Sequence, residues 1–114
     1  MRYNVSLSEG ARQDLRNIKT FLHDQVLEGL APDNLPQLTL DYIKSQIHQL
    51  ELFPKRFPII DIELDMRRMV LDKYRYSVFY RVIEDINNNV KIYYIRHQAQ
   101  ESVFMNNIEP PTEI

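Results

Sequence analysis

The sequence predicts a two-layer α+β domain, in which two helices cover one face of an antiparallel sheet. Three observations predict this class: an alternating apolar segment opens the chain, two amphipathic helical segments follow, and three more alternating segments come after them. The expected order of elements is β-α-α-β-β-β. An N-terminal strand and an α-helical hairpin thus precede a three-stranded antiparallel meander that completes one sheet.

The first strand is expected where Tyr3, Val5 and Leu7 alternate with polar residues. Ser8 then occupies an N-cap position, because its hydroxyl can accept a hydrogen bond from a backbone N–H of the first helical turn. Apolar residues follow at spacings of three and four, at Ala11, Leu15, Ile18, Leu22 and Val26. This pattern predicts an amphipathic helix that ends near Gly29.

A loop rich in proline, aspartate and asparagine is expected over residues 30–36, and a second helix begins near Pro36. Its apolar stripe is formed by Leu40, Ile43, Ile47 and Leu50. Pro54 ends the helical pattern. Residues 52–60 are expected to form a connector without an element of its own.

Three strands are expected over residues 67–71, 76–83 and 90–96, separated by turns at residues 72–73 and 84–89. Short connections make these strands antiparallel neighbours. Both sides of the strands are rich in apolar residues. The pattern therefore leaves open which side meets the helices, and it indicates that the other side is partly covered as well.

Strict alternation of side chains also assigns faces within the third strand. It groups Tyr94 and Arg96 with Val90 and Ile92, and it places Tyr93 on the opposite face.

The chain has 114 residues, which predicts a single domain over residues 1–105 and a flexible C-terminal tail over residues 106–114. A net charge of −2 argues against direct binding to nucleic acid, and the absence of cysteine excludes disulfides and thiol ligands. No signal peptide or membrane span is recognisable, which predicts a cytoplasmic protein. The acidic run Asp61–Asp65 is interpreted as a solvated loop, so neither a metal nor a cofactor is expected.

Several short segments, taken in their order and spacing, resemble the RelE/ParE toxin superfamily. They are Tyr3-Asn4-Val5-Ser6-Leu7-Ser8 before Ala11 and Asp14-Leu15, the Phe53-Pro54 pair, Met69-Val70, Tyr76-Ser77-Val78-Phe79-Tyr80-Arg81-Val82, and Ile95-Arg96-His97-Gln98. The last three look particularly like the ParE branch. The resemblance covers residues 3–101, nearly the whole chain.

The resemblance implies the toxin component of a bacterial type II toxin–antitoxin system. RelE-like members cleave mRNA in the ribosomal A site, whereas ParE-like members typically block DNA gyrase. In both branches a cognate antitoxin wraps around the toxin and neutralises it. The expected partners are therefore an antitoxin, in a hetero-oligomer, and a target such as DNA gyrase.

The chemistry of RNA cleavage separates the two branches. Without a metal, cleavage needs a base for the 2′-hydroxyl, cations for the phosphorane, and an acid for the leaving oxygen. Arg68 falls near a position where RelE-like members carry a basic residue. Val70 and Ser77, however, stand where further basic residues would be expected, and Phe104 stands where the tail would carry a tyrosine. This favours a ParE-like toxin without a catalytic site of its own.

The residues expected to contact a partner are Arg68, Arg75, Tyr76, Arg81, Arg96 and His97. Each also has a structural interpretation. Arginines on antiparallel strands commonly face solvent, and a histidine at the end of a strand often has a structural role. For Arg96, a salt bridge with Asp61, Glu63 or Asp65 is the structural alternative.

Two other hypotheses stay open at the level of sequence. The chain is a ribosome-dependent mRNA endonuclease that uses Arg68, Arg81 and His97, or it is an inactive family member that only binds its antitoxin.

Overall fold

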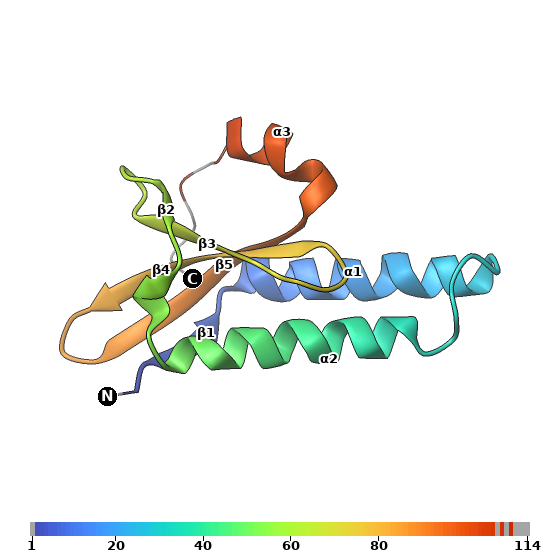
Figure 1. The fold of residues 1–114 in the computed structure, drawn as a ribbon, viewed down its shortest axis with the longest axis horizontal. Coiled ribbons are helices and arrows are strands. Elements are labelled where there is room, and N and C mark those ends of the chain that lie inside the picture. Colours follow the sequence, from blue (N-terminus) through green and yellow to red (C-terminus); the bar gives the residue numbers. More distant parts are fainter. Residues whose placement is uncertain (1, 107, 109, 111–114) are drawn as a thin grey trace.

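The computed structural model describes residues 2–106, 108 and 110, and it places a five-stranded sheet beside two long helices (Figure 1). The helices and strands are β1 (Asn4–Leu7), α1 (Glu9–Leu27), α2 (Leu35–His48), β2 (Ile59–Asp61), β3 (Met66–Val70), β4 (Tyr76–Glu84), β5 (Asn88–His97) and α3 (Glu101–Asn106). The 3₁₀ turns are η1 (Gln49–Glu51), η2 (Pro54–Arg56) and η3 (Gln98–Gln100). The predicted α+β class is confirmed.

The strands follow the order β1-β5-β4-β3-β2, with β1 parallel to β5 and all other neighbours antiparallel. The two ends of α1 follow local rules. The Ser8 hydroxyl accepts a hydrogen bond from the Ala11 N–H at 3.0 Å, and Gly29 follows the helix at φ 74°. Both the predicted cap and the predicted stop are confirmed.

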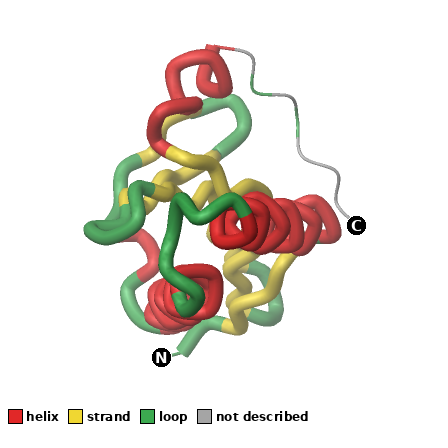
Figure 2. Tube along the Cα trace, turned by 90° about the vertical axis from the view of Figure 1, so that its right-hand side faces the viewer, coloured by secondary structure: helices red, strands yellow, loops and turns green. Residues whose placement is uncertain are grey.

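The main core lies between the sheet and the two long helices, which Figure 2 shows end-on beside the strands. The apolar stripes of α1 and α2 supply Leu15, Ile18, Leu22, Leu40, Ile43 and Ile47. The sheet contributes Val78, Tyr80, Val90, Ile92 and Ile95 to the same core. This settles the face left open by the sequence: the side of β4 that carries Val78 and Tyr80 meets the helices.

A β-bulge in β5 makes the predicted face assignment wrong for Tyr94 and Ile95, although Tyr93 lies on the predicted face. Phe79 pairs with Tyr94 whereas Tyr80 pairs with Ile92, so Tyr93 is an extra residue in the ladder. After the bulge, Ile95 belongs to the helix-side core, and both Tyr93 and Tyr94 pack into the cluster on the other face.

The connector and the C-terminal region contain elements that the sequence did not predict. The connector forms η2 and the edge strand β2, which pairs with β3. Asn106, expected at the start of the tail, is the last residue of α3. Residues 107, 109 and 111–114 of the predicted flexible tail lie outside the described residues.

The face of the sheet opposite the long helices is covered by α3. Its buried cluster comprises Met66, Phe79 and Tyr93, with Phe104 and Met105 of α3 packed against it. The expectation that the second face is partly covered is thereby confirmed. In the part of the chain that the structure describes, no helix is long and apolar enough to cross a membrane.

Candidate functional site

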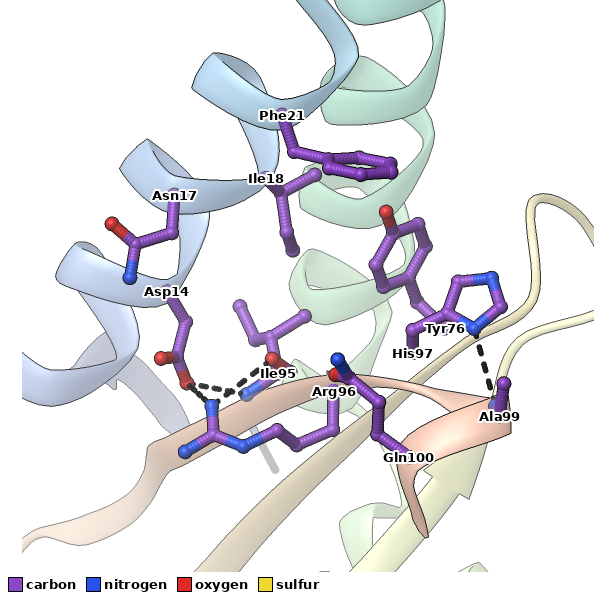
Figure 3. Close-up of a pocket in the computed structure, with 10 residues that line it drawn as sticks. All are labelled: Asp14, Asn17, Ile18, Phe21, Tyr76, Ile95, Arg96, His97, Ala99 and Gln100. Atoms are coloured by element: carbon purple, nitrogen blue, oxygen red, sulfur yellow. Dashed lines mark hydrogen bonds and ion pairs between the residues drawn. The ribbon is translucent and has the colours of Figure 1, made fainter. Parts of the chain in front are cut away.

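A pocket between α1 and the C-terminal end of β5 brings together three of the residues expected to bind a partner (Figure 3). Its cavity measures about 530 Å³ and is lined by Asp14, Asn17, Ile18, Phe21, Tyr76, Ile95, Arg96, His97, Ala99 and Gln100. We call it the α1–β5 pocket. Phe21, at its rim, is 58% exposed, and in Figure 3 the Tyr76 hydroxyl points toward the Phe21 ring.

Arg96 is held in this pocket by Asp14 of α1. An Asp14 carboxylate oxygen accepts hydrogen bonds from the Arg96 guanidinium at 2.5 Å and from the Ile95 N–H at 2.9 Å. β1 pairs with β5 only as far as Ile92, so the carboxylate takes over a position where a strand would otherwise bond. The sequence-based expectation of a salt bridge from Arg96 to the acidic run was wrong, because α1 brings Asp14 to the edge of β5.

Burial raises the pKa of the Asp14 carboxyl, and this effect outweighs the lowering by the Ile95 N–H and by Arg96. The guanidinium of Arg96 also lies over two aromatic rings, 5.1 Å from the centroid of Tyr94 and 5.0 Å from that of Phe104. Arg96 therefore joins α1, β5 and α3, which gives it a structural role in addition to any contact with a partner.

His97 caps the turn that follows β5. Its Nδ1 accepts a hydrogen bond from the Ala99 N–H at 3.1 Å, so a neutral ring carries its proton on Nε2. The ring meets Tyr76 edge to face, with centroids 5.2 Å apart. Burial raises the pKa of the Tyr76 hydroxyl, which therefore stays protonated near neutral pH.

Arg68 lies on the opposite face of the sheet, under α3. Its Nη1 contacts the Met105 sulfur at 3.3 Å and the Glu101 carboxylate at 3.8 Å. Arg68 Nε, Glu101 Oε1 and Ser77 Oγ are buried without a hydrogen-bond partner among the described residues. Arg81 projects from the same side of β4 as Phe79, two residues away, and pairs in the ladder with Lys91.

Phe104 completes the cover over this face. Its ring packs edge-on against Phe79 and Tyr94, at centroid distances of 4.8 and 5.0 Å. Arg75 stands apart from both regions: it is exposed in the turn before β4 at φ 63°, and its carbonyl accepts a hydrogen bond from Gln98 N–H at 2.7 Å.

The structure therefore separates the residues predicted for nuclease chemistry. Arg68 and Arg81 lie on the α3-covered face, whereas His97 lies beside Tyr76 on the helix side. Sequence reasoning missed Asp14, Phe21 and Glu101 as members of these sites. In the part of the chain that the structure describes, no cluster of three or more histidine, aspartate or glutamate side chains could hold a metal.

The same fold occurs in two solved toxin–antitoxin structures. A chain of the chromosomal ParDE TA system from P. aeruginosa superposes with a TM-score of 0.66 at 18% identity, covering 84% of this chain and 96% of that chain. E. coli toxin RelE, as a double arginine-to-alanine mutant in the free state, superposes with a TM-score of 0.57 at 15% identity. This match covers 91% of this chain and 92% of that chain.

No protein-family model matches the sequence, and no curated protein does. The structural likeness shows that this chain has the RelE/ParE fold, as the resemblance in sequence predicted.

Proposed function

We propose that this chain is the toxin of a type II toxin–antitoxin system, of the ParE-like kind. It inhibits bacterial growth in the cytoplasm by binding a protein target such as DNA gyrase, and a cognate antitoxin neutralises it in a hetero-oligomer. The fold shared with ParDE and RelE structures supports the toxin class. Plasmid stabilisation is one role that such a pair can have.

One observation supports binding over catalysis. Arg68 and His97, the cation and the acid–base candidate of the nuclease hypothesis, lie on opposite faces of the sheet, and both are engaged within the chain. Phe104, from the tail, packs in an apolar cluster rather than offering a proton. A phosphodiester would need these groups on one side.

Two assays with purified protein test the proposal. Inhibition of gyrase supercoiling without mRNA cleavage is the expected result. The alternative is the RelE-like endonuclease, which is favoured by the arginines on the α3-covered face and by the structural likeness to RelE. Cleavage of mRNA in a translation extract, abolished by Arg68→Ala, would replace our proposal with that one. Failure of induced expression to slow growth would instead indicate an inactive protein that only binds its antitoxin.

We expect the antitoxin to dock on the helical hairpin and the tyrosine-rich sheet, with the α1–β5 pocket at the centre. Phe21 is an exposed aromatic at the rim of an apolar cavity, the setting in which interface hot spots occur. Phe21→Asp should weaken binding of the small protein encoded by a neighbouring reading frame by at least about tenfold. Calorimetric titration measures the dissociation constant of the complex for wild type and for the variant.

Leu27→Asp is the matched control, because Leu27 lies on the same helix and is 73% exposed without lining the pocket. Equal weakening by both variants would contradict docking at this pocket. Removal of the antitoxin's C-terminal segment should also abolish the complex.

A further inference from the structure

Phe53 combines exposure with an unfavourable backbone conformation. Its side chain is 76% exposed, and its backbone lies at φ 52°, ψ 50°, the left-handed region that glycine and asparagine adopt more readily. The turn itself is needed, because the carbonyl of Pro54, the next residue, accepts a hydrogen bond from the buried Tyr80 hydroxyl at 2.5 Å. The fold thus explains the backbone shape at this position but not the choice of phenylalanine.

A cavity of about 380 Å³ opens beside this side chain, and we call it the Phe53 pocket. Its apolar wall is formed by Phe53 and Leu52, and its rim carries the guanidinium groups of Arg2 and Arg56 and the imidazole of His48. Glu51 also lines the pocket, but its carboxylate is engaged by Arg2 at 3.2 Å and by His48 at 3.1 Å. The rim therefore carries two arginines against one carboxylate, and the pocket is an apolar hollow with a net positive rim.

The turn between β2 and β3 has the opposite character. Ile62 is 88% exposed and is flanked by Asp61 and Glu63, with Asp65 closing the turn. The turn is fixed: the Leu64 N–H donates to the Asp61 carboxylate at 3.0 Å, and the Asp65 N–H donates to the Ile62 carbonyl at 3.2 Å. We call residues 61–65 the Ile62 knob.

The Ile62 knob and the Phe53 pocket are complementary in both polarity and charge. An exposed apolar side chain flanked by carboxylates matches an apolar hollow with a net positive rim, the arrangement that directs one protein surface onto another. Within the described residues, no ion pair uses Glu63 or Asp65, so these charges are available to a second molecule.

We propose that two copies of this chain associate, each placing its Ile62 knob in the Phe53 pocket of the other. Only residues 57–60 separate Arg56, the last residue that lines the Phe53 pocket, from the Ile62 knob, and Figure 1 shows the two segments toward the end of the long axis where the β4–β5 hairpin turns. A twofold axis can therefore close both contacts at once. Because each contact is small, the dimer is weak, with a dissociation constant in the micromolar to millimolar range.

The experiment is sedimentation velocity of the purified full-length chain, without antitoxin, over about a hundredfold range of concentration. The expected result is a monomer–dimer equilibrium that weakens between about 50 mM and 500 mM salt, since the charges are exposed. Ile62→Ser and Phe53→Asn should each weaken dimerisation at least about tenfold. Asparagine tolerates the left-handed conformation, so the second variant keeps its fold.

Leu30→Ser is the matched control, because Leu30 is 69% exposed in the loop between α1 and α2, at the other end of the long axis (Figure 1). Mixing the two defective variants supplies the sharpest test. Ile62→Ser keeps the pocket and Phe53→Asn keeps the knob, so one contact is restored in the mixture and the average sedimentation coefficient should rise above that of either variant alone.

A monomer at every concentration, equal weakening by Leu30→Ser, or no recovery on mixing would each overturn the proposal. Shift of the sedimentation boundary by a single-stranded oligonucleotide, lost in Phe53→Asn and without self-association, would assign the pocket to nucleic acid instead. The association needs neither target nor antitoxin, so it stands or falls separately from the toxin function.

Discussion

On one face of the sheet, two long helices close a continuous apolar core, whereas on the other a helix of six residues covers a cluster of three buried side chains. The polar groups differ as well. On the helix side, Asp14 makes hydrogen bonds to both Arg96 and the Ile95 N–H. Under α3, Arg68 Nε and Glu101 Oε1 are buried without a hydrogen-bond partner among the described residues.

The difference indicates where stability and adaptability lie. A face closed by many complementary side chains unfolds only with the whole domain, whereas a short helix held by two apolar side chains, Phe104 and Met105, and by a loose ion pair can open locally. The helix side is therefore the scaffold. The α3-covered face is the part of the sheet that can change its contacts at low free energy.

Truncation of one buried side chain on each face tests this comparison most strongly. Ile43 is fully buried in the helix-side core, so Ile43→Ala should lower the free energy of unfolding by about 2–5 kcal/mol. Phe104→Ala should lower it by less than about 2 kcal/mol, because the loss is limited by the free energy that docks α3. Urea denaturation measures both, with Ile86→Ala as the exposed control. Equal losses at Ile43 and Phe104 would show that α3 is as integral as the core.

The two ion pairs provide a second, smaller contrast. Asp14→Ala removes the acceptor that Arg96 and the Ile95 N–H share and leaves Arg96 only its weaker bond to the Ile95 carbonyl at 3.3 Å, so it should destabilise the fold by about 1–3 kcal/mol. Glu101→Ala removes a contact of 3.8 Å that has no hydrogen bond, together with a buried carboxylate oxygen that lacks a hydrogen-bond partner among the described residues, so it should change stability by less than about 1 kcal/mol. Urea denaturation of both variants measures the two losses of stability. A larger loss at Glu101 would mean that the charge under α3 is an organising contact of the fold.

These contrasts also mark what the sequence could predict. Regular periodicity and local caps gave both long helices and the three main strands, because Ser8, Gly29 and the apolar stripes act through neighbours close in sequence. The likeness to toxin structures was carried by short motifs in a fixed order, and the fold bears it out.

The features that shape the candidate sites gave no such signal. The extra residue Tyr93 fits an alternating pattern as well as any neighbour does, so the bulge was invisible and the faces beyond it were misassigned. Asp14 reaches Arg96 across 82 positions of sequence, a distance that no local pattern spans. α3 has only six residues, too few to show an apolar periodicity. Its packing depends on contacts of the Phe104 ring with Phe79 and Tyr94, which are distant in sequence.

The smallest expected effect is the pH dependence of stability that comes from the Asp14 carboxyl. Burial raises the pKa of the Asp14 carboxyl above its usual 3.8, so the folded protein binds a proton at this group more readily than the unfolded chain does. Between these two pKa values the folded state holds more protons. The contribution of Asp14 to stability therefore increases as the pH falls toward 3.8 and decreases as the pH rises through the folded pKa.

Asp14→Asn isolates this effect, since asparagine keeps the shape and one acceptor but does not titrate. Wild type should gain stability relative to Asp14→Asn as the pH is lowered from neutral toward 4, measured by urea denaturation and by NMR titration of the carboxyl carbon. If the stability of wild type relative to Asp14→Asn instead falls as the pH is lowered, then Arg96 lowers the pKa of the Asp14 carboxyl more than burial raises it. The carboxylate would then hold Arg96 as a net stabilising pair, rather than as a buried charge retained because Arg96 and the edge of β5 need its oxygen.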